Sequence, residues 1–249
     1  MKSLWNSFKI AFAMFSKIPM PQADWSEENM RYMLCFFPFV GAAVGVVMLG
    51  MEWLCRYFGM SNGFIAVALV LVPVIVTGGI HVDGLLGTSG ALSSWGDREK
   101  RLEILKDSHA GAFAVITACV YFLTMYGGMS QIVEQDNRKM LYILATGYMV
   151  SRCLSGIGVI TLPKANASGT VAEFSRKAQD TRVRNILIIY LVLLTGFMFW
   201  IQPVWGTAVI VTALLVFWFY RHKALKYFGG TTGDLSGYFL CLCEVWIVL

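Results

Sequence analysis

Long apolar runs dominate the sequence, and they decide what the chain can fold into. A helix that crosses the hydrocarbon core of a bilayer needs about 20 predominantly apolar residues. Seven runs approach or reach this length: 34–56, 63–81, 110–130, 140–162, 184–202, 204–220 and 235–249. Only Gln202 and Pro203 separate the fifth run from the sixth, which predicts a tight hairpin between two helices. We therefore expect an all-α, polytopic membrane protein, a helical bundle with about seven transmembrane helices.

The composition supports a membrane protein. Of the 249 residues, 57% are hydrophobic and 14% are charged. Soluble domains have roughly 45–50% apolar and about 25% charged residues, so this chain has too few polar side chains to cover a soluble core. This excludes a soluble enzyme, a disordered chain and a secreted disulfide scaffold. No linker or internal repeat divides the sequence, and residues 1–249 are expected to form a single domain.

Cationic residues predict the orientation of the spans. Most of the 20 Lys and Arg residues lie before the first span or in the connectors 82–109, 163–183 and 221–234. Because cytoplasmic loops are enriched in Lys and Arg, we expect the N-terminus and these connectors to be cytoplasmic. Residues 4–18 lack a signal-peptide cleavage site and predict an interfacial helix. The cations form no basic stripe among aromatic residues, which argues against a nucleic-acid partner.

The segment Thr77–Gly90 holds the first group of unusual residues. It contains five glycines among 14 residues, a pattern typical of backbone that turns tightly or approaches a ligand, not of a plain helix end. Asp83 is a carboxylate at a bilayer boundary, which is costly unless it is paired, solvated or bound to a cation. The alternative is a solvated aspartate that caps the next helix. His81, two residues earlier, is predicted to be a hydrogen-bonding partner and not a metal ligand.

Residues 97–107 predict a short amphipathic helix in the same connector, with Asp97 as its N-cap. Lys106 and Asp107 follow it and directly precede the third span. Their place at the membrane boundary makes them candidates for a functional role.

The segment Phe228–Gly237 holds a second group. Thr231, Thr232, Gly233 and Asp234 stand at the start of the last span, where backbone N–H groups can bind phosphate. Asp234 is also a candidate ligand for Mg²⁺, which takes one or two carboxylates together with substrate phosphates and water. No GK[ST] sequence is present, so this is not a Walker A loop.

Two charged residues lie inside predicted spans. We expect either that Arg152 pairs with Glu244 or that Arg152 binds a phosphate group. The polar residues gather at one face of the membrane, which favours a transferase acting on a phosphorylated substrate. The alternative is an ion-coupled transporter. Such a protein would show glycine-broken spans in two matching halves of its sequence, and this sequence does not.

Several motifs resemble those of one family. The longest are Thr77–Leu85 and Arg101–Phe113, and shorter matches occur at Ser16–Pro19, Phe37–Gly45, Ser151-Arg152 and Gly229–Gly237. Together they span nearly the whole chain and resemble the cobalamin synthase family (adenosylcobinamide-GDP ribazoletransferase).

The resemblance implies an enzyme of the bacterial inner membrane that needs Mg²⁺ as cofactor. It would transfer the phosphocobinamide part of adenosylcobinamide-GDP to α-ribazole or its 5′-phosphate and release GMP. We expect Asp83, Asp107 and Asp234 to be catalytic, with Asp83 and Asp234 on the metal. The expected substrate-binding residues are His81, Lys106, Arg152, Lys164, Thr231, Thr232, Gly233 and Glu244. Lys106, Arg152 and Lys164 would add positive charge near the phosphates. A homo-oligomer is compatible with the sequence.

The chain departs from the family pattern at two acidic positions. The family usually continues as D-G-x-x-D-T-x-D, but here Gly87 and Gly90 stand where the second and third aspartates are expected. Cys241 replaces a frequent glutamate, whereas Glu244 is kept. We hypothesise that the fold and the substrate site are retained while catalysis is impaired. A catalytically degenerate corrinoid-binding paralogue is the alternative.

Overall fold

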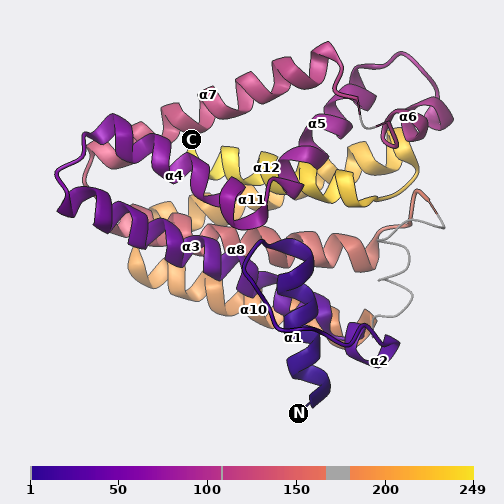
Figure 1. Ribbon diagram of the computed structural model, residues 1–249, viewed down its shortest axis with the longest axis horizontal. Coiled ribbons are helices and arrows are strands. Elements are labelled where there is room, and N and C mark those ends of the chain that lie inside the picture. Colours follow the sequence, from indigo (N-terminus) through magenta and orange to yellow (C-terminus); the bar gives the residue numbers. More distant parts are fainter. Residues whose placement is uncertain (1, 108, 167–179) are drawn as a thin grey trace.

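Helices make up the regular structure of the chain, apart from one isolated bridge between Lys164 and Thr231 (Figure 1). The computed structural model describes residues 2–107, 109–166 and 180–249. The elements are α1 (Lys2–Phe15), α2 (Glu27–Met30), α3 (Met33–Tyr57), α4 (Asn62–Thr77), α5 (Ile80–Ser93), α6 (Arg98–Ile104), α7 (Ala112–Glu134), α8 (Arg138–Thr161), α10 (Asp180–Ile201), α11 (Pro203–Lys223), the π-helix η1 (Ala224–Phe228) and α12 (Gly233–Val248).

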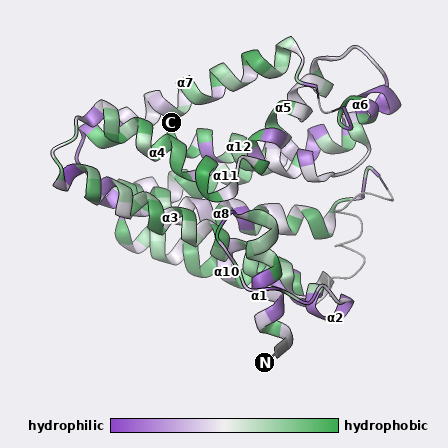
Figure 2. Cartoon of the chain, viewed as in Figure 1, coloured by the Kyte–Doolittle hydropathy of each residue, from purple (hydrophilic) through white to green (hydrophobic). Residues whose placement is uncertain are grey.

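Five helices of the described residues are long and apolar enough to cross a membrane, namely α3, α7, α8, α10 and α11 extended through η1. Helices α4 and α5 pass the same test as a pair, but they are bent by 93° at the break between them. Figure 2 shows the apolar residues along these helices and hydrophilic residues gathered on α6. The fold class is therefore confirmed: the chain is an all-α, multi-pass membrane protein.

Five helices, or six with the bent pair, pass this test among the described residues, so the predicted number of seven spans is not confirmed. The run 235–249 forms α12, which has 16 residues and is largely buried inside the bundle. The run 63–81 ends as a helix at Thr77, and the pair of α4 and α5 counts as a sixth span only if the bend is ignored. The predicted hairpin between α10 and α11 is confirmed, with Pro203 in the first turn and the Gln202 side chain accepting a hydrogen bond from the Val204 N–H.

The bend between α4 and α5 is made by two glycines. Gly78 has φ 66° and Gly79 has φ 79°, a left-handed conformation that glycine adopts without a steric penalty. The N–H of Lys17 donates to the carbonyl of Val76 at 2.8 Å, so the segment after α1 lies against this bend. The prediction of a tight turn is confirmed here. The segment that follows the bend, Ile80–Ser93, is helical.

Glycines also let the central helices approach each other closely. A Cβ at Gly41 would lie 2.4 Å from the carbonyl oxygen of Tyr148, and one at Gly45 would lie 2.8 Å from that of Ala145. This spacing on α3 is the G-x-x-x-G pattern that lets membrane helices pack backbone against backbone. Helix α8, in the middle of the bundle, is consequently among the most deeply buried of the spans.

The three predicted cytoplasmic connectors come together at one end of the molecule. In Figure 1, α6, the segment after α8 and the turn between η1 and α12 lie at the same end, and the connection between α3 and α4 lies at the other. The short helix α6 and its N-cap are as predicted, since the Asp97 side chain accepts a hydrogen bond from the Lys100 N–H. Part of the predicted connector 163–183 lies outside the described residues.

A candidate metal and phosphate site between α5 and α12

The site is built on the close crossing of α5 and α12. A Cβ at Gly84 would lie 2.6 Å from the carbonyl oxygen of Asp234, and a Cβ at Gly237 would lie 3.0 Å from that of His81. No other residue type fits at these two places without moving the helices apart. Of the five glycines of Thr77–Gly90, Gly84 therefore serves to bring α5 against the first turn of α12.

A cavity of about 200 Å³ lies beside this crossing. Its wall combines polar residues of α5, α8 and α12 with apolar residues of α1 and α3. The lining residues are Met14, Phe15, Leu34, Phe37, Ile80, His81, Asp83, Ser155, Val159, Gly233, Asp234, Ser236, Gly237 and Leu240. Asp83 and Gly233 are exposed, so the cavity opens beside them.

Two carboxylates from different helices converge on the cavity. Asp83 is exposed, and Asp234, in the first turn of α12, is half-buried. Burial, together with the negative charge of Asp83, raises the pKa of Asp234 above its ordinary value. No Lys or Arg is among the described residues that line the cavity. The bare cavity therefore repels anions, and a cation between the two carboxylates would reverse this.

These two carboxylates fit the usual coordination of Mg²⁺, which is rarely enclosed by protein ligands alone. Mg²⁺ is commonly held by one or two carboxylates, with phosphate oxygens and water completing its octahedron. Asp83 and Asp234 supply that number of carboxylates at the mouth of the cavity. Among the described residues, no group of three or more His, Cys, Asp or Glu side chains is placed to hold a metal ion. The substrate would have to complete the coordination.

The charged residues of the bundle interior form an ion pair. The Arg152 guanidinium is fully buried and donates to the Glu244 carboxylate, which is also buried. Arg152 further donates to the Ser151 hydroxyl at 3.0 Å and faces Nδ1 of His81 at 3.4 Å. The predicted pairing of Arg152 with Glu244 is therefore confirmed. Neither Arg152 nor Glu244 lines the cavity, and Arg152 contacts His81, which does.

The residues before α12 mainly hold the chain in place. Thr231 is buried, and its hydroxyl is hydrogen-bonded with that of Tyr220. Its backbone forms the bridge to Lys164, whose ammonium group donates to the carbonyl of Leu162 at 2.6 Å. The Thr232 hydroxyl caps α12 by accepting from the Leu235 N–H. Of the four residues predicted to bind phosphate here, Thr231, Thr232, Gly233 and Asp234, the last two line the cavity.

Lys106 and Asp107 lie after α6, are exposed and do not line the cavity. Hydrogen bonds from the backbone N–H and the ring of His109 hold the pKa of Asp107 below its ordinary value. Their roles in substrate binding and catalysis stay predictions.

The sequence reasoning missed several residues of the cavity. Ser155 and Ser236 supply hydroxyls to its wall, and Phe15 and Phe37 supply aromatic surface. One signal for Ser155 is present in the sequence. Ser151 and Ser155 are four residues apart on α8 and so share a face of this helix, close to Arg152. The apolar residues carry none, since they look like any other apolar residue of α1 and α3.

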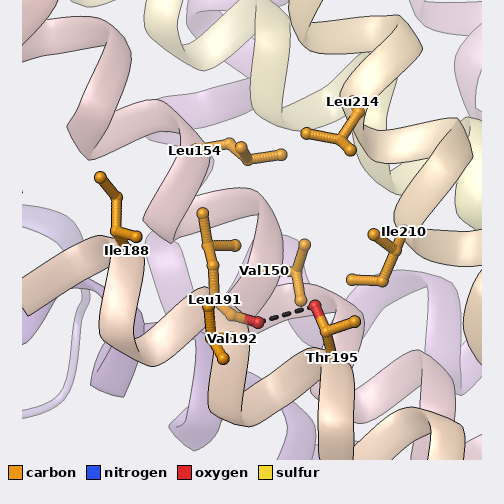
Figure 3. Close-up of a pocket in the computed structure, with 8 residues that line it drawn as sticks. All are labelled: Val150, Leu154, Ile188, Leu191, Val192, Thr195, Ile210 and Leu214. Atoms are coloured by element: carbon orange, nitrogen blue, oxygen red, sulfur yellow. Dashed lines mark hydrogen bonds between the residues drawn. The ribbon is translucent and has the colours of Figure 1, made fainter.

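Not every cavity of the described residues has such chemistry. Figure 3 shows one of about 250 Å³ between α8, α10 and α11. Its lining is aliphatic except for Thr195, whose hydroxyl donates to the carbonyl of Leu191 at 2.7 Å. With no titratable side chain in its wall, this cavity offers nothing to hold a metal or move a proton.

The close approach at Gly84 makes a testable prediction about stability. We expect Gly84→Ala to lower the free energy of unfolding by about 1–3 kcal/mol, because the new methyl group meets backbone that cannot yield. Gly90→Ala is the control, since nothing lies within 4 Å of a Cβ there. That variant should be neutral or more stable by up to about 1 kcal/mol, from its higher helix propensity. Thermal unfolding in detergent measures both, and equal effects would contradict the predicted contact.

Comparisons with a family model and with known proteins point to the same family. The model of the family described as "Cobalamin-5-phosphate synthase" matches residues 7–249. A protein of Lachnoclostridium phytofermentans named "Adenosylcobinamide-GDP ribazoletransferase" is 42% identical over 240 residues, which cover 96% of this chain and 90% of that protein. Proteins with the same name from Clostridium botulinum and Desulfitobacterium hafniense are each 30% identical, over 98% and 100% of this chain and 96% of their own lengths. The comparison with solved structures found no match.

Proposed function

The chain belongs to the cobalamin-5-phosphate synthase family, and on that premise we propose that it catalyses the last assembly step of the cobalamin nucleotide loop. It transfers the phosphocobinamide part of adenosylcobinamide-GDP to α-ribazole, or to α-ribazole 5′-phosphate, and releases GMP. The relatives that share most of its length are named for this reaction. We propose that the site is the cavity beside the crossing of α5 and α12.

One observation carries this assignment of the site. Two carboxylates from different helices, Asp83 and Asp234, meet at a cavity whose described wall has no cationic side chain. A phosphorylated substrate can enter such a place only together with a cation. The start of α12 adds the positive end of a helix dipole on the same side. The apolar part of the wall, from α1 and α3, suits the non-phosphate part of a large substrate.

The reaction is a phosphoryl transfer. A ribose hydroxyl oxygen forms a bond to the phosphorus that carries cobinamide, and its proton passes to the leaving GMP or to solvent. The bond from that phosphorus to GMP breaks, and GMP leaves with the electron pair. Bound Mg²⁺ would neutralise charge on the diphosphate as the leaving oxygen develops it. Asp83 and Asp234 would hold the metal, and the chain's main contribution is to position the two substrates and exclude water.

The arrangement of the helices supports a proposal about where the site lies in the cell. The start of α12 is at the end of the molecule that carries α6 and the other predicted cytoplasmic connectors (Figure 1). We propose that the cavity opens to the cytoplasm from the bacterial inner membrane. A homo-oligomer stays a prediction.

The proposed activity is tested by GMP release. Purified protein in detergent is given adenosylcobinamide-GDP, α-ribazole and Mg²⁺, with and without a chelator, and GMP and the corrinoid product are quantified. We expect both products to form in equal amounts and chelator to stop their formation. Saturable corrinoid binding without GMP release would contradict the transferase and support the degenerate paralogue. If the protein neither binds corrinoid nor releases GMP, the result would support the transporter.

The glycines at positions 87 and 90 make a prediction about turnover. Asp83, Gly87 and Gly90 share one face of α5, spaced by four and three residues. A Cβ at Gly87 would have one ordinary contact, with Leu105 at 3.8 Å, and a Cβ at Gly90 would have none, so both positions accept a side chain. We expect Gly87→Asp with Gly90→Asp to raise turnover at least roughly tenfold, because added carboxylates strengthen Mg²⁺ binding.

The matched control is Gly87→Asn with Gly90→Asn, which has the same shape without the charge. Its turnover should stay near that of the unaltered chain. If the unaltered chain already turns over as fast as the double aspartate variant, catalysis is not impaired by the two glycines.

A further inference from the structure

Two polar atoms in the wall of the site cavity are buried without a partner. They are Nε2 of His81 and the hydroxyl oxygen of Ser155, and neither has a hydrogen-bond partner in the part of the chain that the structure describes. His81 is 7% exposed and Ser155 is 1% exposed, and both line the cavity. Buried polar groups are rarely left unpaired, because each unmade hydrogen bond is costly. Two of them on one cavity indicate a ligand that supplies the missing partners.

The Arg152 side chain decides which nitrogen of His81 carries the proton. A guanidinium has N–H donors only and cannot accept a hydrogen bond. Its nitrogen lies 3.4 Å from Nδ1 of His81, so Nδ1 must be the acceptor and carries no proton. The ring proton is then on Nε2, the nitrogen on the cavity. His81 therefore presents an N–H donor to the cavity, and not a lone pair.

The guanidinium is itself fixed from several sides. It donates to Glu244, to the Ser151 hydroxyl at 3.0 Å and to the Tyr148 carbonyl at 3.3 Å. The rings of Phe37 and His81 pack edge to face, with their centroids 6.2 Å apart. The imidazole is thus held in one orientation before a ligand arrives.

We propose that His81 Nε2–H and the Ser155 O–H donate hydrogen bonds to oxygens of a phosphate ester bound in this cavity, and that Arg152 and Glu244 are positioning residues acting through His81. This rests on the proposed function and deepens it. It assigns His81 the role of donor and not that of the base that activates the attacking hydroxyl. Donors at the inner wall and carboxylates at the mouth would then hold the phosphate from two sides.

The tautomer is measured without any enzyme assay. His81 is one of three histidines, so a chain labelled with ¹⁵N-histidine and carrying His109→Gln and His222→Gln gives its signals alone. In detergent we expect the Nε2–H tautomer, and inorganic pyrophosphate with Mg²⁺ should shift the Nε2 signal. A proton on Nδ1, or signals that pyrophosphate leaves unchanged, would overturn the proposal.

Variants test the donors in catalysis. Glutamine at position 81 places an N–H near the position of Nε2, whereas asparagine reaches only near Nδ1. We expect His81→Asn and Ser155→Ala each to lower kcat/KM roughly 10- to 100-fold, and His81→Gln to lose much less. Thr195→Val is the control for loss of a hydroxyl, since Thr195 lies in the aliphatic cavity of Figure 3 and bonds to its own helix.

The two experiments separate the failure of the inference from that of the function. Equal losses in His81→Gln and His81→Asn, or a Ser155→Ala variant as active as Thr195→Val, would overturn the donor assignment while the transferase stands. If the unaltered chain releases no GMP, the function fails, and the ¹⁵N spectra with pyrophosphate still decide whether His81 is a phosphate donor.

Discussion

Asp83→Asn and Asp234→Asn are each expected to lower kcat/KM by at least about 10³-fold, equal to about 4 kcal/mol of transition-state stabilisation. The two carboxylates are the metal-binding groups of the proposed site, and an amide oxygen without charge is a much weaker ligand for Mg²⁺. Neither variant changes the shape of the side chain. The loss should therefore come with a higher half-saturating concentration of Mg²⁺, measured by GMP release at increasing metal.

Asp97→Asn is the matched control for these variants. Asp97 caps α6 at the same end of the molecule, and asparagine is as good an N-cap as aspartate. We expect this variant to keep its activity and its metal dependence. Asp83→Asn and Asp234→Asn variants with unchanged kcat/KM would place the metal elsewhere.

Removal of one partner of the Arg152–Glu244 pair is expected to have the largest effect on stability. Glu244→Gln leaves a fully buried guanidinium without its counter-charge, and such a change costs about 3–5 kcal/mol of unfolding free energy. SDS or urea titration in detergent micelles measures it. Glu103→Gln is the control, because the Lys100–Glu103 pair is exposed and contributes less than about 1 kcal/mol.

The double variant Arg152→Met with Glu244→Met separates stability from function. Replacing both charges with apolar side chains of similar size is often neutral or stabilising, so much of the lost stability should return. Activity should not return, because nothing then fixes the proton of His81 on Nε2. A double variant that recovers both would show that the pair serves the fold alone.

Much of the fold follows from the sequence because membrane helices leave a strong pattern. The runs around Met33–Tyr57, Ala112–Glu134 and Arg138–Thr161 became helices of nearly the predicted bounds. The sequence did not predict the helix Ile80–Ser93. Its glycines lower helix propensity, yet the contact with α12 needs small residues and compensates for that cost. Tertiary packing of this kind cannot be deduced from local composition.

The candidate site was predicted only in part. Asp83 was identified from the cost of a carboxylate at a bilayer boundary, His81 as its neighbour, and Asp234 from its place at the start of the last span. The structure brings all three to one cavity. Intramembrane charge likewise identified the pair of Arg152 and Glu244. Ser155 was not predicted, because its importance depends on α8 passing beside α5 and α12.

A structure of the protein with adenosylcobinamide-GDP and Mg²⁺ bound, by crystallography or electron cryo-microscopy, tests the central claim most directly. We expect the diphosphate beside the crossing of α5 and α12, a metal ion between Asp83 and Asp234, and His81 Nε2 within hydrogen-bonding distance of a phosphate oxygen. A diphosphate bound at any other place on the protein, with this cavity filled by water alone, would contradict it.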